Sequence, residues 1–406
     1  MKAPALLTIA AAVGLLGMRG PAVANPNTDL SVPRFPPLVL YVARGAGGCG
    51  DGCDEWIAAE GGFDIGSAQR LRTFLTQFSD RIPPIYFQSP GGIQEEAIAI
   101  GRLMRERGVT AGVGRTLPYG CAPGKDGEDR CLTLKRSGLP LAGELQSTGA
   151  SCSSACVYAL LGAQVRLVPP DARLGVHASR RVRVYPDGRV TRLPGDDQTQ
   201  LGQATNELKQ YVQEMGIDVG LIDTAFKTKF SDAYFLTRNE IVQFGIDTRT
   251  FQETRWTVLD STSRRPSVFK LVVETHGDEG ATTSLIQLAC ANAGEIQIGY
   301  VRAAAPNEIA PALVRAIAGD HRMTFARPGP AVHVTGLDND TPYEPRSLSA
   351  RPEFFEAAIS AGSMVISESS LRPDSPHVLR LATAGLPEAI ATLRKSCRPQ
   401  SMASAR

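Results

Sequence analysis

The sequence predicts an α/β fold in which an α/β domain, residues 38–251, precedes a second, smaller β-rich C-terminal domain, residues 255–400. From residue 38 to 251, short apolar runs alternate with stretches that repeat apolar residues at helical spacing, a pattern typical of α/β proteins. From residue 255 onward the apolar runs are short, and we predict a helix only for the last of them. The length of 406 residues also favours two domains.

The first domain is predicted element by element from these runs. A strand over 39–42 is followed by a partner strand or a turn over 57–62. Leu71, Phe74, Leu75 and Phe78 recur at helical spacing and predict a helix over 67–78. The further elements expected are strands over 84–88, 109–113 and 174–177, helices over 95–107, after Ser154 and over 198–215, and a hairpin with arms 181–185 and 189–193.

The second domain is predicted to be built of short strands. We place them at 271–275, 284–288, 295–301, 322–325, 331–334 and 363–367, with a helix over 386–393 before the C-terminus. No chemical motif occurs in this part of the chain. Its histidines lack metal-binding spacing, so we expect each to face solvent or to be satisfied by neighbours; they are His276, His321, His333 and His377.

The first 24 residues have the composition of a secretory signal peptide. Lys2 supplies a charged start, residues 6–18 form a 13-residue apolar stretch, and Ala22-Val23-Ala24 is an Ala-x-Ala cleavage site. That stretch is shorter than the roughly 20 residues of a membrane-spanning helix. We expect cleavage after Ala24, with an uncleaved anchor as the alternative. Residues 25–37, polar and rich in proline, are then a loose leader.

All eight cysteines follow the cleavage site, and exported chains oxidise such cysteines to disulfides. Cys49 and Cys53 are near enough for a local bridge. A loop rich in glycine, proline and charged residues carries Cys121 and Cys131. These two could form disulfides with Cys152 and Cys156, which flank Ser154.

Two cysteines, Cys290 and Cys397, remain for a bridge in the C-terminal region. The two Cys-x3-Cys pairs could instead supply four sulfur ligands to zinc. The export signal favours disulfides, so no metal is expected.

Charge excludes one class of partner. Loss of Lys2 and Arg19 with the signal peptide lowers the net charge from +2 to zero, and a neutral chain without basic runs is not built to hold nucleic acid. No other stretch is apolar for 18 residues, so no membrane association is expected after cleavage.

Two stretches together supply what acyl transfer needs, which is a hydroxyl, an imidazole and a glycine turn with free N–H groups. The first is Ser89-Pro-Gly-Gly92, after an apolar strand. The second runs from Ser151-Cys-Ser-Ser-Ala-Cys156 through an apolar helix and an Arg-x-x-Pro turn to His177.

This combination resembles the ClpP-like serine proteases and, more loosely, the crotonase superfamily, over residues 38–250. The resemblance implies a ClpP/crotonase-like ββα-superhelix core with Ser154 as nucleophile, His177 as base, and the N–H groups of Gly91 and Ala155 as oxyanion donors. It further implies that the 198–215 helix mediates subunit contacts in a homo-oligomer. Residues 235–247 resemble the family's closing motif, a short helix and a last strand.

Two assignments stay open. The family's helix has a glycine nine residues after its nucleophile, which fits Ser153 with Gly162, whereas the Cys-x-Ser-Ala-Cys pattern of exported relatives favours Ser154. The position expected for the family's acid is Lys229 here, so Asp232 is preferred as the third catalytic member, with Asp223 as the alternative.

The resemblance implies an exported, periplasmic or secreted serine hydrolase, a peptidase without cofactor acting on peptides or unfolded proteins. The chain has no Gly-x4-Gly-Lys-Ser/Thr loop, and no ATPase partner is expected outside the cytoplasm. The alternatives are a catalytically degenerate ClpP-like binding or scaffold protein and, third, a crotonase-type acyl-CoA enzyme.

Overall fold

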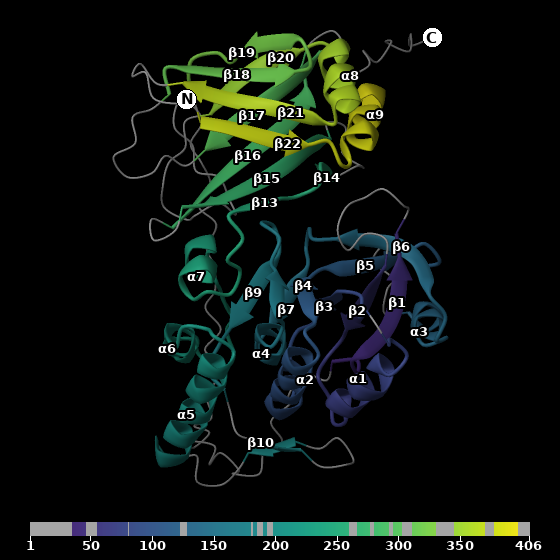
Figure 1. Ribbon diagram of the computed structural model, residues 1–406, viewed down its shortest axis with the longest axis vertical. Coiled ribbons are helices and arrows are strands. Elements are labelled where there is room, and N and C mark those ends of the chain that lie inside the picture. Colours follow the sequence, from purple (N-terminus) through teal and green to yellow (C-terminus); the bar gives the residue numbers. More distant parts are fainter. Residues whose placement is uncertain are drawn as a thin grey trace, which may run out of the picture. The chain divides into compact units, whose positions relative to one another are not determined.

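The computed structural model describes the chain in thirteen stretches (Figure 1), and they include neither the signal peptide nor most of the predicted leader. Cys49, Cys53, His333 and Cys397, and the strand predicted over 331–334, also lie outside them. No helix in the described part is long and apolar enough to cross a membrane. The stretches are 35–45, 55–79, 81–121, 128–179, 182–184, 190–192, 198–259, 266–276, 280–291, 295–302, 311–329, 345–369 and 377–396.

A mixed α/β architecture is present, as predicted. One sheet has seven strands in the order β5-β6-β1-β2-β3-β4-β8. β1 and β2 are antiparallel, whereas β2, β3, β4 and β8 are parallel neighbours. The segment left open between strand and turn is therefore strand β2. The strands are β1 (Val39–Arg44), β2 (Trp56–Glu60), β3 (Ile85–Gln88), β4 (Thr110–Val113), β5 (Arg115–Pro118), β6 (Leu141–Gln146) and β8 (Val165–Leu167).

The helices that build the first hydrophobic core with this sheet include α1 (Ser67–Leu75), α2 (Gln94–Glu106) and α4 (Ala155–Leu161). All seven residues of α4 are buried. A Cβ atom at Gly162 would lie 2.1 Å from the Gly101 carbonyl oxygen. The glycine after α4 is therefore required by close packing on α2, and it does not identify the nucleophile.

A second sheet has the strand order β12-β9-β7, with β7 and β9 parallel. It is formed by β7 (Ser151–Ser153), β9 (Arg173–Val176) and β12 (Tyr234–Phe235). The helices that follow in sequence are α5 (Gln198–Glu214), α6 (Gly220–Lys227) and α7 (Arg238–Gln243). α7 begins with a capping box between Thr237 and Glu240. The last strand expected before residue 247 does not form.

The segment between β5 and β6 contains a helix that was not predicted, α3 (Asp129–Lys135). Its last residue is buried, and Lys135 Nζ lies 2.5 Å from Glu60 Oε2 on β2. The predicted hairpin is present in its described arms, where β10 (Val182–Val184) pairs with β11 (Val190–Arg192).

The C-terminal region has its own hydrophobic core, built by two antiparallel sheets and two helices. Its first strand, β13, pairs with β15. The six-stranded sheet contains β13 (Phe251–Glu253), β14 (Thr257–Leu259), β15 (Ser267–Thr275), β16 (Ala281–Cys290), β17 (Ile296–Arg302) and β20 (Arg346–Ala350). The four-stranded sheet contains β18 (Leu313–Ala318), β19 (His321–Thr324), β21 (Ser363–Ser369) and β22 (His377–Ala382), and the helices are α8 (Pro352–Ala361) and α9 (Leu386–Ser396).

Candidate active site

Ser154 occupies a strained elbow between β7 and α4. Its φ of 56° makes it the only non-glycine residue with positive φ in the part of the chain that the structure describes. Such backbone conformations are costly for L-residues and cluster at functional sites. The Ser154 side chain makes no capping hydrogen bond to α4, so helix capping does not explain this serine.

The neighbouring serine is an ordinary strand residue. Ser153 ends β7 and is paired with Gly175 of β9. A Cβ atom at Gly175 would lie 2.7 Å from Ser153 Oγ, so this hydroxyl lies directly over a glycine that leaves room for it. The two adjacent serines therefore differ: Ser153 is part of the sheet, and Ser154 forms the turn.

The glycine turn that follows β3 lies against the elbow. Ser89 donates its N–H to the Ser151 carbonyl oxygen at 3.0 Å, and Ser153 donates to that of Ser89 at 3.0 Å. Gly91 has φ 108°, and a Cβ atom there would lie 2.6 Å from Ser154 Cβ and 2.8 Å from the Ser153 carbonyl oxygen. Only glycine fits this approach.

The two predicted oxyanion donors differ in their present partners. Ala155 is the first residue of α4, and the first N–H groups of a helix have no acceptor within it. The Gly91 N–H instead donates to Ser89 Oγ at 3.1 Å. An oxyanion would thus meet a free N–H at Ala155. The Gly91 N–H would first have to leave the Ser89 hydroxyl oxygen before it could donate to the oxyanion.

His177 is the residue after β9, so it follows the strand that pairs with β7. The Ser154 N–H donates to the Gly175 carbonyl oxygen at 2.7 Å, which brings the elbow beside the end of β9. His177 Nδ1 lies 2.9 Å from the Ala178 carbonyl oxygen. A carbonyl can only accept, so Nδ1 donates to it, and in the neutral imidazole Nε2 is then the nitrogen with the lone pair. The ring also meets Phe230 edge-on at 5.1 Å between centroids.

Neither predicted acid contacts the imidazole. Asp232 is exposed and accepts a hydrogen bond from the Ser231 hydroxyl at 3.4 Å. Asp223 pairs with Lys209 at 2.6 Å. Lys229, at the expected position of the family's acid, is exposed. The Ala178 carbonyl takes the place of an acid as the group that fixes the tautomer of His177.

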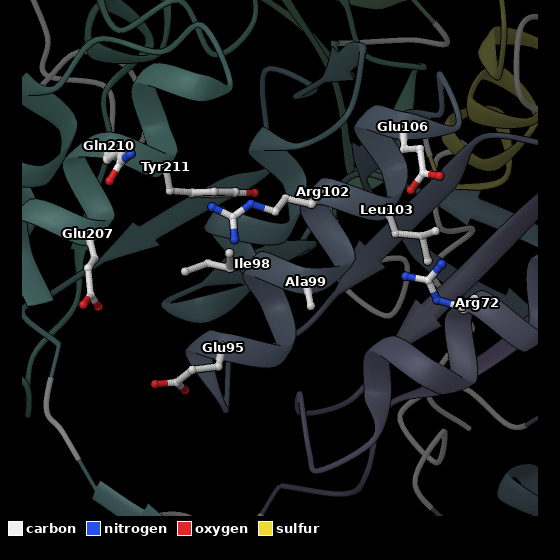
Figure 2. A pocket seen from close by; sticks show the side chains of 10 residues that line it. All are labelled: Arg72, Glu95, Ile98, Ala99, Arg102, Leu103, Glu106, Glu207, Gln210 and Tyr211. Atoms are coloured by element: carbon white, nitrogen blue, oxygen red, sulfur yellow. The ribbon is translucent and has the colours of Figure 1, made fainter.

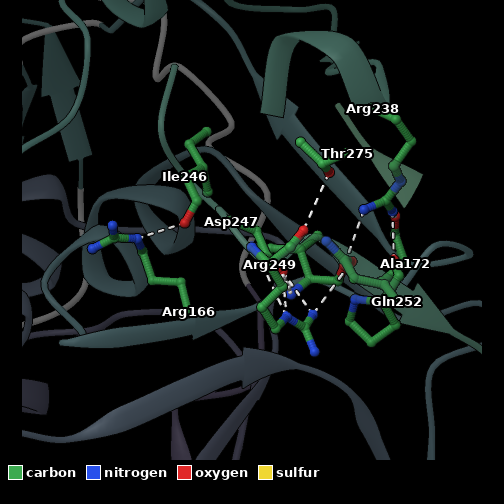
Figure 3. Close-up of polar contacts among 10 residues, drawn as sticks. Arg166, Ala172, Arg238, Ile246, Asp247, Arg249, Gln252 and Thr275 are labelled. Atoms are coloured by element: carbon green, nitrogen blue, oxygen red, sulfur yellow. Dashed lines mark hydrogen bonds and ion pairs between the residues drawn. The ribbon is translucent and has the colours of Figure 1, made fainter. Parts of the chain in front are cut away.

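Two ionic groups that sequence reasoning missed hold the turn before β9 (Figure 3). Arg238 donates to the carbonyl oxygens of Val168 and Ala172 at 2.9 Å each and to that of Pro169. Asp247 is buried and accepts the Val168 N–H at 2.8 Å. Because β9 starts directly after this turn, these contacts fix the strand that ends at His177. Their signal in the sequence was the closing motif that contains both residues.

Arg166 adds a third ionic contact at the same place. Its guanidinium donates to the carbonyl oxygen of Ile246 at 2.6 Å (Figure 3). It also donates to the carbonyl oxygens of Ala163 at 2.9 Å and Gly245 at 3.1 Å. It thereby joins β8 and the end of α4 to the segment after α7. The arginine of the Arg-x-x-Pro turn thus has a structural role.

The disulfides differ from the expected pairing. Cys121 is bonded to Cys131, and Cys152 to Cys156, with Cα atoms 5.4 and 5.3 Å apart. The expectation that the loop cysteines reach those around Ser154 is therefore wrong. Both bridges are local, and a shorter loop costs less entropy to close. Cys290 is also disulfide-bonded, and its pairing with Cys397 stays a prediction.

One cavity lies away from this site. It has a volume of about 500 Å³ and contains none of the proposed catalytic residues (Figure 2). On its wall, Arg102 pairs with Glu214 at 3.0 Å and lies over the Tyr211 ring. Its lining is Arg72, Glu95, Ile98, Ala99, Arg102, Leu103, Glu106, Glu207, Gln210 and Tyr211.

The described histidines of the C-terminal region behave as predicted. His276 and His321 are exposed. His377 is satisfied by two carboxylates, with Nε2 2.8 Å from Glu274 Oε2 and Nδ1 3.2 Å from Glu368 Oε2. These hydrogen bonds, that to Glu274 first, raise the pKa of His377 to about 9. Among the described residues no group of three or more His, Cys, Asp or Glu side chains could hold a metal ion.

Comparison with solved structures finds similar chains. A mutant of the 1510-N membrane-bound stomatin-specific protease is 17% identical over 51% of this chain and 78% of its own, at a TM-score of 0.28. A second mutant, in complex with a substrate peptide, is 17% identical over 51% and 74%, also at 0.28. A ClpP1 mutant from Listeria monocytogenes is 14% identical over 45% and 80%, again at 0.28. No family model and no curated protein matches the chain.

Proposed function

We propose that this chain is an exported serine hydrolase with a ClpP-like site, acting as an ATP-independent peptidase on peptides or unfolded segments. The observation that carries the proposal is the conformation of Ser154. A serine with positive φ at the start of a buried helix, with its hydroxyl free of any cap, beside the strand that precedes His177, supports the role of nucleophile.

In the proposed reaction, His177 Nε2 takes the proton of Ser154 Oγ as that oxygen attacks the substrate carbonyl carbon. The oxyanion that forms accepts the Ala155 N–H at the positive end of α4. His177 then gives its proton to the leaving amine, and water hydrolyses the acyl-enzyme by the same path in reverse order. With a carbonyl in place of an acid behind the imidazole, the site operates as a Ser–His dyad.

The second candidate is a catalytically degenerate ClpP-like protein that binds peptides without cleaving them. Two observations favour it: among the described residues no carboxylate contacts His177, and the Gly91 N–H is engaged by Ser89. Asp232 as third catalytic member is retained only if it moves toward the imidazole when substrate binds.

Labelling by a fluorophosphonate probe separates the two candidates, because this reagent needs an activated serine. The wild-type protein and Ser153→Ala should be labelled at similar rates, whereas Ser154→Ala should not react. An unlabelled wild type supports the binding protein. Equal labelling of the two variants would contradict the choice of Ser154.

The proposal of export is tested on the mature protein. Intact mass after expression with the native N-terminus should correspond to a chain that begins at Asn25, and alkylation without reduction should find no free thiol. Retention of residues 1–24 would favour the uncleaved anchor. The homo-oligomer implied by the resemblance is checked on the same sample by light scattering, where a monomer would contradict it.

A further inference from the structure

We propose that the Cys152–Cys156 disulfide is a positioning element of the site: it holds the elbow in the conformation that aims Ser154 Oγ. This inference rests on the proposed function, since positioning matters for catalysis only if Ser154 reacts.

The bridge encloses the nucleophile. Cys152 lies in β7, two residues before Ser154, and Cys156 lies in the first turn of α4, two residues after it. The bond therefore closes a short ring through Ser153, Ser154 and Ala155. That ring contains both the reactive hydroxyl and the free oxyanion N–H, so it fixes the two groups relative to each other.

The elbow needs such a restraint. An L-residue leaves the φ of Ser154 for a more favourable region unless its surroundings determine the conformation. The side chain supplies no cap. The noncovalent restraints are the bond from the Ser154 N–H to Gly175 at 2.7 Å, the bond from the Val157 N–H of α4 to the Ser154 carbonyl oxygen at 3.1 Å, and the close approach of Gly91. The disulfide adds a covalent link between β7 and α4 across the elbow.

The bridge is protected in the folded protein. Cys152 and Cys156 are both 0% exposed, so a reductant does not reach them without local opening. The Cys121–Cys131 disulfide serves as the control. It closes a longer loop, since its cysteines are 10 residues apart in sequence and Cys152 and Cys156 are 4 apart. In the chain-entropy model the longer loop contributes more to stability. Stability and activity should therefore rank the two bridges in opposite orders.

The test compares Cys152→Ala/Cys156→Ala with Cys121→Ala/Cys131→Ala in fluorophosphonate kinetics. For the first variant we expect the maximal inactivation rate to fall about 100-fold with an unchanged probe affinity, since small misplacements of a nucleophile cost rates of this order. The second variant should keep the wild-type rate within about threefold. A wild-type rate in the first variant, or an equal loss in both, would overturn the proposal.

If the first variant does not fold, partial reduction of the wild type replaces it. A small dithiol gives two electrons and two protons to the bridge, forming two thiols, and is itself oxidised to a cyclic disulfide. The sample is then alkylated, which marks the reduced cysteines, and treated with the probe. Tandem mass spectrometry should find the probe adduct on chains whose Cys152 and Cys156 are not alkylated, that is, chains with the bridge intact. An adduct distributed without regard to alkylation refutes the proposal.

Failure of the proposed function has a different signature, namely a wild type that no probe labels. Hydrogen exchange then decides the structural half of the inference. The amides of Ser154 and Val157, bonded to Gly175 and to the Ser154 carbonyl oxygen, should exchange faster in Cys152→Ala/Cys156→Ala and not in the control variant. Unchanged exchange there would show that the bridge does not hold the elbow.

Discussion

Replacement of Gly91 by alanine tests the packing of the glycine turn on the nucleophile. The positive φ costs any L-residue about 1–2 kcal/mol. The added methyl also meets Ser154 Cβ at 2.6 Å and the Ser153 carbonyl oxygen at 2.8 Å, and such overpacking costs about 1–3 kcal/mol. We therefore expect Gly91→Ala to lower the free energy of unfolding by about 2–5 kcal/mol.

Gly138→Ala is the matched control. Gly138 has φ 76°, and a Cβ atom there has no neighbour within 4 Å. It should cost only the backbone part, about 1–2 kcal/mol. The difference between the two variants then isolates the contact with Ser154.

The assay uses the two tryptophans of the chain. Trp256 belongs to the core of the C-terminal region, and Trp56 on β2 belongs to a small hydrophobic cluster on the seven-stranded sheet. In a Trp256→Phe background, the fluorescence of Trp56 reports urea unfolding of the seven-stranded sheet to which β2 belongs. Fluorophosphonate labelling of the same variants should fall about 100-fold for Gly91→Ala, because the methyl displaces Ser154, and stay unchanged for Gly138→Ala. Equal stability and equal labelling of the two variants would refute the packing argument.

The remaining predictions concern three other places in the fold. Hydrogen bonds to Glu274 and Glu368 raise the pKa of His377 to about 9, above its unfolded value of about 6.5. The protonated His377 therefore adds at most about 3 kcal/mol to the free energy of unfolding, fully present below pH ~6.5 and lost as pH rises to ~9. His377→Gln should remove this pH dependence of the free energy of unfolding, as measured by urea titrations. Arg238→Gln removes the hydrogen bonds to the carbonyl oxygens of the turn before β9 and should lower the free energy of unfolding by about 2–4 kcal/mol in the same assay. A loss below about 0.5 kcal/mol would show that Arg238 does not hold this turn. Cys121→Ala/Cys131→Ala should cost about 2–3 kcal/mol, and an unchanged midpoint would contradict the loop-closure estimate.

The sequence predicted which segments lie together better than it predicted their geometry. Ser154, His177 and the glycine turn follow from their order along the chain, and the structure brings the three segments together. The positive φ of Ser154 and the Ala178 carbonyl behind His177 could not be predicted, because backbone conformation and backbone acceptors leave no mark on residue type. The acid was sought among side chains for the same reason.

The disulfide pairing and two helices show another limit. An even cysteine count predicts bridges but not partners, and here the strand-to-helix elbow brings Cys152 to Cys156 within reach. α3 was missed because the glycine, proline and charge around it are typical of a loop. α8 was missed although Phe354, Phe355 and Ala358 recur at helical spacing after Pro352 at the first turn. The helix is short and lies between segments with strand-like patterns, so its helical spacing did not stand out in the sequence.

The central claim, that Ser154 is a nucleophile activated by His177, is tested most directly by mapping the fluorophosphonate adduct. Tandem mass spectrometry of the labelled wild type should place the phosphonyl group on Ser154 Oγ, and His177→Gln should slow its formation at least about 1,000-fold while the urea midpoint of the first core stays near that of the wild type. An adduct on Ser153 or another residue, or a His177→Gln variant that reacts at the wild-type rate, would contradict the account.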